Sequence, residues 1–381
     1  MEPRGRRRKQ QGEEAAAGDK ENGAGAAPPP KRPRTGRKPL ADLPTANNAP
    51  AAAGPPIQAP KRRTRAAARE EAAAVVEAEA RKREEGSTIA VSPAVSRHLD
   101  AGAAQAAVAP YIRDIDQYLR SLEAERLRRP RDDYIGAIQK DINANMRGIL
   151  VDWMVDVVDE FKLLPDTLYL AVSCIDRFLT ASAINRNKLQ LLGVASLFVA
   201  AKYEEIYLPA VNKFSEITDG TYTNQQVVKM EADILKFLNF QLGSPTVRTF
   251  LWRFLTSCRG GNRASAKRLE LTCSYLAELS LLDYDCIRFL PSVIAAACLF
   301  VARLTISPKT RPWNLTLQEN TGYKVSHLKS CILRIHELQL GRKYPNLKAI
   351  KSKYSERKFG CVSMVASPEE ISASFLEDIS K

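Results

Sequence analysis

The sequence predicts an all-α protein preceded by a long segment that does not fold. Apolar residues recur with a 3.6-residue period after Tyr111, and strand-like alternation is sustained nowhere. All 12 Phe, 12 Tyr and 3 Trp lie at or after Tyr111, whereas the first hundred residues hold 12 of the 22 prolines. Without aromatic residues, a segment cannot bury enough apolar surface to offset its chain entropy. We therefore expect residues 1–108 to be disordered.

The first helices follow in order along the chain. Apolar residues from Tyr111 to Leu122 have helical spacing, so a helix is expected within residues 109–130. The run from Ile149 to Phe161 places apolar side chains at i, i+1, i+4, i+5, i+8, i+9 and i+12, which is a clear helical face. Pro165 and Asp166 are typical of the start of the next helix.

Two further helices complete the first block. Residues 189–203 are apolar nearly all round, which predicts a central buried helix. Thr223 is a suitable N-cap for a helix that carries Val227, Met230 and Leu238. Gly243-Ser244-Pro245 then interrupts the helical pattern.

A second helical block runs from Val247 to about Leu340 and partly repeats the first. Leu197-Phe198-Val199-Ala200 recurs as Leu299-Phe300-Val301-Ala302, on a second helix of small and apolar residues. Four identical residues are weak support alone, but the similar context and block size make two related helical domains plausible. The basic, mostly polar residues 346–381 are expected to form a loosely docked tail.

Composition excludes several classes of protein. The seven cysteines are scattered without a CxxC pair, so neither a zinc ribbon nor a disulfide framework is indicated, and a reducing intracellular compartment fits best. The N-terminus lacks the apolar region of a secretory signal, and the longest apolar run, 289–302, is too short to cross a bilayer. No P-loop, GxGxxG, nucleophile elbow or metal-ligand cluster appears, so we predict neither an enzyme nor a bound cofactor or metal.

Four charged residues of the first block lie where apolar residues belong. They are Arg147, Asp176, Lys202 and Glu231. A lone buried charge is costly, so these residues should form ion pairs or face a partner protein. The alternative is that they lie at helix edges and extend their charged ends into water.

Several strings of residues resemble the cyclin box of A- and B-type cyclins. They occur in family order, without obvious gaps, between residues 146 and 242: Met146–Trp153, Ile175–Leu179, Lys188–Leu191, Ala201–Tyr207 and Lys229–Glu231. Glu204-Glu205-Ile206-Tyr207 and Ser244-Pro245-Thr246-Val247 look A-type, and the sequence between the motifs is most similar to plant A-type cyclins of the third subgroup. Together these motifs are highly specific.

The resemblance implies two tandem cyclin folds of five helices each. An N-terminal helix at 109–130 would precede a first fold at 131–242 and a second at 243–345, with the tail at 346–381. It also implies that Arg147 and Asp176 form a buried structural pair, and that Lys202 and Glu231 lie at an interface with a kinase.

By the same resemblance, the chain is a non-catalytic subunit that activates a cyclin-dependent protein kinase and controls S phase and G2/M. A rigid helical partner can do so by selecting the active arrangement of the kinase. The kinase-facing residues implied are Tyr111, Ile115, Lys202, Tyr203, Glu205, Glu231, Leu235 and Phe240. Plain core packing is the alternative for each apolar member.

The resemblance also implies a shallow groove that binds substrates and inhibitors bearing Arg-x-Leu motifs. An apolar slot would take the Leu and a carboxylate the basic residue. The implied groove residues are Met146, Ile149, Leu150, Trp153, Asp156, Leu189, Gln190 and Ile217. Asp156 stands where many relatives carry the longer Glu, and Gly148 replaces the commoner Ala. Part of this helix must also pack inward, so core packing is the alternative for Ile149, Leu150 and Trp153.

The N-terminal segment carries strings that resemble degradation signals. Lys20-Glu21-Asn22 spells a KEN box, and Arg37-x-x-Leu40 resembles a destruction box, which predicts recognition by a ubiquitin ligase of the anaphase-promoting type. Basic clusters at residues 6–9, 31–34 and 61–63 favour import into the nucleus, with or without shuttling to the cytoplasm. Ser-Pro dipeptides at Ser92, Ser307 and Ser367 are minimal proline-directed phosphorylation sites.

The main rival hypothesis is a nucleic-acid-binding transcription factor built on paired cyclin folds. A net charge of +14 and two helical repeats would suit that role. It needs neither degradation signals nor the Lys202 and Glu231 charges. No aromatic residues alternate with the basic clusters to stack on bases, so nucleic-acid binding is the less favoured hypothesis.

Overall fold

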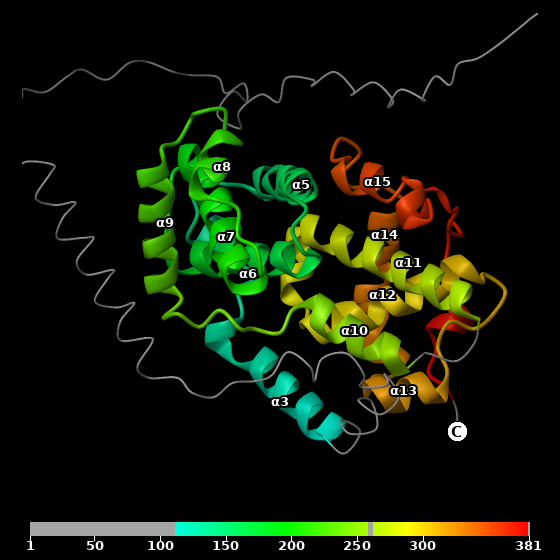
Figure 1. The fold of residues 1–381 in the computed structure, drawn as a ribbon. Coiled ribbons are helices and arrows are strands. Elements are labelled where there is room, and N and C mark those ends of the chain that lie inside the picture. Colours follow the sequence, from blue (N-terminus) through cyan, green and yellow to red (C-terminus); the bar gives the residue numbers. More distant parts are fainter. Residues whose placement is uncertain (1–110, 258–261, 380–381) are drawn as a thin grey trace, which may run out of the picture. The chain divides into compact units, whose positions relative to one another are not determined.

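The computed structural model describes residues 111–257 and 262–379 (Figure 1). Within this part of the chain the fold is helical, and its β-structure is confined to one isolated bridge between Ile135 and Gln139. The predicted all-α class is therefore confirmed. The segment predicted to be disordered, residues 1–108, lies outside the described residues.

The first fold consists of five helices after an N-terminal helix, α3 (Ile112–Ala124), and a short turn, α4 (Tyr134–Ala137). The five are α5 (Ala144–Phe161), α6 (Pro165–Ala181), α7 (Leu189–Glu204), α8 (Val211–Glu216) and α9 (Asn224–Phe237). Helix α7 contacts each of the other four, and its residues 189–201 are all buried. The prediction of a central buried helix is thus confirmed.

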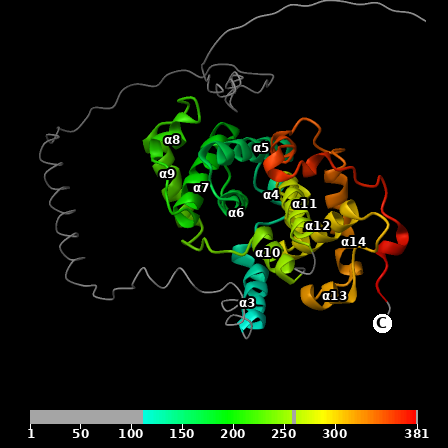
Figure 2. The ribbon, with the colours of Figure 1, turned by 45° about the vertical axis from the view of Figure 1, so that its right-hand side comes forward.

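The second fold repeats this arrangement with five helices. They are α10 (Val247–Ser257), α11 (Arg263–Leu282), α12 (Pro291–Ile306), α13 (Leu315–Thr321) and α14 (Val325–Gln339). Helix α12 occupies the position of α7, in contact with α10, α11 and α14 (Figures 1 and 2). The repeated segments 197–200 and 299–302 are buried on these two central helices, because small and apolar residues allow close packing on every side.

Local signals in the sequence explain where the helices begin. Thr223 caps α9 through a capping box, in which its side chain accepts from the N–H of Gln226 and the Gln226 side chain accepts in return from the N–H of Thr223. Pro165 and Pro291 open α6 and α12, where the missing N–H costs nothing. The Asn143 side chain accepts from the N–H of Met146, at 2.9 Å, and caps α5.

The N-terminal helix is joined to the second fold by polar contacts. Arg120 on α3 donates to the Thr321 carbonyl at 2.5 Å and to the Tyr323 hydroxyl at 3.1 Å. The buried Glu123 carboxylate accepts from the N–H and hydroxyl of Ser292, at 3.0 and 2.6 Å, and so caps α12. Burial raises the pKa of Glu123, against the opposing effect of the bonds from Ser292. Helix α3 is therefore held in place by side chains that are distant in the sequence.

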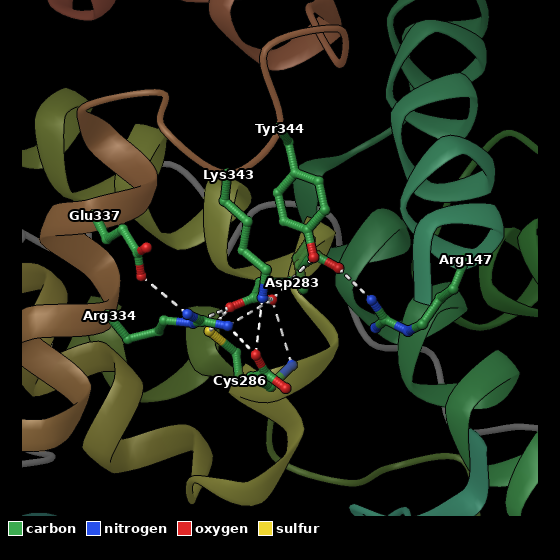
Figure 3. Close-up of polar contacts among 9 residues, drawn as sticks. Arg147, Asp283, Cys286, Arg334, Glu337, Lys343 and Tyr344 are labelled. Atoms are coloured by element: carbon green, nitrogen blue, oxygen red, sulfur yellow. Dashed lines mark hydrogen bonds and ion pairs between the residues drawn. The ribbon is translucent and has the colours of Figure 1, made fainter. Parts of the chain in front are cut away.

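A second polar cluster forms around Asp283, which is fully buried at the end of α11 (Figure 3). Its carboxylate accepts from Arg334 at 2.5 Å, from Lys343 at 2.7 Å and from the Tyr344 hydroxyl at 3.0 Å. Burial by itself raises the pKa of Asp283, but the two cations more than offset this and hold the pKa below its usual value. The cluster fixes the end of α11 to α14 and to the segment that follows it.

The C-terminal segment is docked firmly, so the prediction of a loosely docked tail was wrong. It forms α15 (Ala349–Lys353), followed by short 3₁₀ turns, and it buries Ile350, Tyr354 and Val362 almost completely. Lys353 Nζ lies 2.8 Å from both oxygens of Glu278, which is itself 1% exposed, and the Tyr354 hydroxyl donates to Glu278 at 2.7 Å. Composition suggested a polar tail because it does not reveal that Lys353 has a buried partner, Glu278, on α11.

Replacing Lys353 with alanine is expected to destabilise the fold by about 2–4 kcal/mol, because the buried Glu278 carboxylate would lose its counter-ion. Lys358→Ala is a matched control, since the Lys358–Asp159 pair is about half exposed on both sides. Urea unfolding measures both free energies of unfolding. Equal losses for the two variants would contradict the structural role assigned to Lys353.

Candidate functional site

Lys202 and Glu231 form an ion pair between the end of α7 and the middle of α9. Lys202 Nζ lies 2.6 Å from Glu231 Oε1, and 4.1 Å from the centroid of the Phe198 ring. The Glu231 side chain is only 10% exposed, whereas that of Lys202 is 42% exposed. The pair thus presents its positive end to solvent and keeps its negative end covered.

The predicted neighbours of this pair lie in different environments. Tyr203 and Phe240 are exposed, at 54% and 70%, and Leu235 is half-buried. Glu205 Oε1 accepts from the N–H of Leu164 and the hydroxyl of Thr167, at 2.6 Å each, so this carboxylate caps the start of α6. Tyr111 and Ile115 are exposed on α3.

Exposed apolar residues on α7, on α9 and on the segments that follow these two helices extend beyond those predicted. Ile206 and Tyr207 follow α7 and are 88% and 90% exposed, and Phe237 at the end of α9 is about half exposed. We call Lys202, Tyr203, Ile206, Tyr207, Glu231, Leu235, Phe237 and Phe240 the α7–α9 surface. The position of Ile206 and Tyr207 in the sequence could have identified them. These two large apolar residues come directly after the end of a helix and before Leu208-Pro209, so they cannot pack inward as part of a helical face.

The residues of the predicted groove divide into a surface set and a core set. Met146, Ile149, Trp153, Asp156 and Ile217 are half-buried, as expected of a groove. Leu150 and Leu189 are instead fully buried, because α5 packs its other face against α7. The Leu150 side chain lies so close to Gly193 that a methyl group added to Gly193 would meet it at 2.7 Å. Gln190 is 3% exposed, and its Oε1 has no hydrogen-bond partner in the described structure.

Arg147 and Asp176 form a bidentate ion pair between α5 and α6. Arg147 Nε and Nη2 lie 2.6 and 2.7 Å from the two Asp176 oxygens, and Tyr134 donates to the same carboxylate at 2.8 Å. The third guanidinium contact is with the Leu281 carbonyl of the second fold, at 2.8 Å (Figure 3). Both side chains are almost fully buried. The four unusual charges of the sequence therefore make two internal pairs and do not extend separately into water.

A second carboxylate on α5, Asp152, holds the C-terminal segment. It lies one turn before Asp156 and accepts from the N–H of Ala349 at 3.0 Å, at the start of α15. Burial raises the pKa of Asp152 to about 6, assisted by the nearby charge of Asp156 and opposed by the backbone bonds from Ala349 and Lys348. The Asp152 carboxylate therefore binds a proton more tightly in the folded chain than in the unfolded chain.

The free energy of unfolding should depend on pH through Asp152. Because its folded-state pKa is raised, its contribution is greatest below pH about 4 and is lost as pH rises through about 6. Relative to Asp152→Asn, the wild-type chain is expected to lose about 1–2 kcal/mol over that interval, after allowance for partial exposure. Urea unfolding at a series of pH values measures the difference, and a difference that is constant from pH 4 to 7 would contradict the assignment.

Residues 111–257 and 262–379 contain no group of three or more His, Cys, Asp or Glu side chains that could hold a metal ion. Among the described helices, none combines the length and apolar character that a membrane span requires.

Comparison with known proteins identifies the family. Residues 114–243 match the N-terminal domain model of cyclins, and residues 245–368 match the C-terminal domain model. The chain belongs to the cyclin family. This cyclin is 58% identical over 271 residues to Cyclin-A3-2 of Oryza sativa subsp. japonica, an alignment that covers 71% of this chain and 70% of that protein. The predicted resemblance to plant A-type cyclins is thus confirmed.

Other relatives agree with this identification. Putative cyclin-A3-1 of Arabidopsis thaliana is 52% identical over 270 residues, covering 71% of this cyclin and 76% of the relative. The G2/mitotic-specific cyclin C13-1 of Daucus carota is 50% identical over 269 residues, covering 71% and 79%. The crystal structure of a viral cyclin from herpesvirus saimiri matches 58% of this cyclin and 95% of its own chain, with a TM-score of 0.52 and 21% identity. This last similarity shows the shared fold, and the predicted tandem cyclin folds are confirmed.

Proposed function

We propose that this cyclin binds a cyclin-dependent serine/threonine kinase through the α7–α9 surface and α3, and thereby activates it. The ion pair between Lys202 and Glu231, at the edge of exposed Tyr203 and Phe240, is the observation that carries this proposal. Single exposed apolar residues are ordinary, but several around one half-covered ion pair are typical of an interface with another protein.

Activation requires no catalytic group on the cyclin. A protein kinase becomes active when its Lys–Glu ion pair and metal-binding Asp are assembled, which depends on the position of one mobile helix. A preformed surface that binds only the active position shifts the kinase population toward it. The packed core beneath α7 and α9 supports such a role, because it keeps the surface rigid.

The face of α5 supports a second role, the recruitment of substrates and inhibitors that bear Arg-x-Leu motifs. Met146, Ile149 and Trp153 leave apolar surface partly open, and Asp156 adds a carboxylate on the same helix.

The proposed cell-cycle role is the control of S phase and G2/M, together with ubiquitin-dependent destruction of the chain and action in the nucleus. The KEN string at residues 20–22, the Arg37-x-x-Leu40 string and the basic clusters are the sequence features that support it. All of them lie outside the described residues. Substitution of Arg37 and Leu40 by alanine is expected to prolong the life of the protein in mitotic extract, and an unchanged half-life would count against the destruction box.

The proposed function is tested by mixing the purified full chain with an inactive cyclin-dependent kinase. We expect a stoichiometric complex on gel filtration and phosphorylation of histone that neither protein gives alone. If no candidate kinase is bound or activated, and the chain instead binds DNA in a salt-sensitive manner, the transcription-factor hypothesis would replace this one.

A further inference from the structure

The second fold contains a cavity whose charge is entirely positive. The cavity, of about 220 Å³, lies between the start of α11, the end of α12 and the loop before α13. Its lining residues are Ser265, Ala266, Leu269, Arg303, Ile306, Ser307, Thr310, Arg311 and Pro312. Two guanidinium groups and three hydroxyl groups line it, and no carboxylate does. Such a lining suits an anion with several acceptor oxygens.

The positive charge of the cavity is not neutralised by the described residues. Arg303 has no described carboxylate partner, and Arg311 donates to the backbone carbonyl of Glu377, at 2.6 Å, which is a neutral acceptor. By contrast, Arg334 on α14 of the same fold is paired with the buried Asp283. The arginines of this cavity therefore differ from those of the structural ion pairs, because their positive charge has no described counter-ion.

One lining residue can itself supply the anion. Ser307 is the serine of a Ser-Pro dipeptide, and the segment 307–311 is exposed. Ser367-Pro368 is engaged in packing, because the Ser367 hydroxyl lies 3.3 Å from that of Thr305 and the Pro368 carbonyl is hydrogen-bonded to the buried His336 at 2.8 Å. Ser92 lies outside the described residues. Of the two described Ser-Pro sites, Ser307 is therefore the accessible one.

We propose that Ser307 is a phosphorylation site whose phosphate is held in this cavity by Arg303 and Arg311. Arg303 lies one helical turn before Ser307, since the Ser307 N–H donates to the Arg303 carbonyl at 2.9 Å at the end of α12. Arg311 follows four residues later, after a turn closed by the Thr310 N–H and the Ser307 carbonyl, at 3.1 Å. Arg303, Ser307 and Arg311 therefore lie close together along the chain, and all three line the cavity.

The modification needs Mg-ATP and a proline-directed protein kinase. The Ser307 hydroxyl oxygen forms a bond to the γ-phosphorus of ATP, and the bond from that phosphorus to the β–γ bridging oxygen breaks. The hydroxyl proton passes to the general base of the kinase, and ADP leaves. The new dianion lies at the C-terminus of α12, where the helix dipole opposes it, so the two arginines are required to hold it.

Binding of the phosphate would compete for Arg311 with the Glu377 carbonyl. The adjacent Asp378 carboxylate accepts from the N–H and hydroxyl of Ser326, at 2.9 and 2.8 Å, so the last described residues are attached at two neighbouring points. Loss of one of them is expected to increase proteolysis of the C-terminus in the phosphorylated protein.

The test uses the full chain and a proline-directed kinase that needs no cyclin, so that its outcome is independent of the proposed function. Peptide mass spectrometry is expected to find phosphate on Ser307. A phosphatase should remove it at least fivefold more slowly from the wild-type chain than from the R303Q/R311Q double variant. The matched control is K329Q/K351Q, which removes the same charge from exposed positions away from the cavity and should behave as wild type.

Phosphorus NMR gives a second measurement, since the bound phosphate should have a lower second pKa in the wild-type chain than in R303Q/R311Q. Thermal melting shows that each variant is folded. The proposal is overturned if Ser307 stays unmodified while other Ser-Pro sites react, or if phosphatase rate and phosphate pKa are the same in both chains.

Discussion

Lys202→Ala is expected to weaken kinase binding and activation by roughly 30-fold or more. Truncating one partner of a buried, hydrogen-bonded charge pair costs about 2–5 kcal/mol at an interface, and 2 kcal/mol corresponds to about 30-fold in affinity. Glu231 is only 10% exposed in the free chain, and a bound kinase would cover it further. Without Lys202 its carboxylate would be left unpaired in the interface, and the interface would also lose its exposed positive charge.

The control for this experiment is Lys213→Ala, whose ion pair with Glu216 is more than half exposed on both sides. That variant should bind and activate the kinase like the wild type. Affinity is measured by calorimetry and activation by histone phosphorylation, with thermal melting to show that each variant is folded. A folded Lys202→Ala chain that activates the kinase normally would remove the main support for the proposed interface.

Helices and their inward faces were predictable because the information for them is local. The period of apolar residues from Ile149 to Phe161 gave α5, and the nearly continuous apolar run after Leu189 gave the central helix α7. Charges within apolar stripes were also visible in the sequence. The pairing of Arg147 with Asp176 came from the family resemblance, whereas the pairing of Lys202 with Glu231 is visible only in the structure, since each pair joins residues 29 positions apart.

Contacts between distant segments were not predictable from these patterns. The C-terminal segment looked like a polar tail because Glu278, which neutralises Lys353 and accepts from Tyr354, lies 75 residues earlier in the sequence. Leu150 and Leu189 were assigned to a groove, but α5 is apolar on more than one face, and periodicity does not say which face α7 covers. Gly148 also lies against the docked C-terminal segment. A methyl group there would meet the Leu347 side chain at 3.2 Å, so an Ala at this position would require Leu347 to shift by a few tenths of an ångström.

Arg147→Ala is expected to destabilise the protein by about 3–5 kcal/mol, the usual cost of removing one partner of a buried ion pair. The Asp176 carboxylate would keep the Tyr134 hydroxyl as its hydrogen-bond donor but lose both bonds from the guanidinium. The Leu281 carbonyl would lose its bond as well. A melting temperature lower by roughly 6–20 °C should follow for a folded region of this size.

One further substitution separates charge from geometry at this position, and another, at an exposed arginine, is the control. Arg147→Lys keeps the charge, but an ammonium group cannot reproduce the planar contact with Asp176 while also reaching Leu281, so an intermediate loss is expected. Arg131→Ala removes an arginine whose pair with Asp133 is about half exposed on both sides, and it should cost no more than about 1 kcal/mol. Urea unfolding compares the three variants. Because Arg147 contacts both folds, a loss below about 1 kcal/mol for Arg147→Ala would mean that the two cyclin folds hold their arrangement without this ion pair.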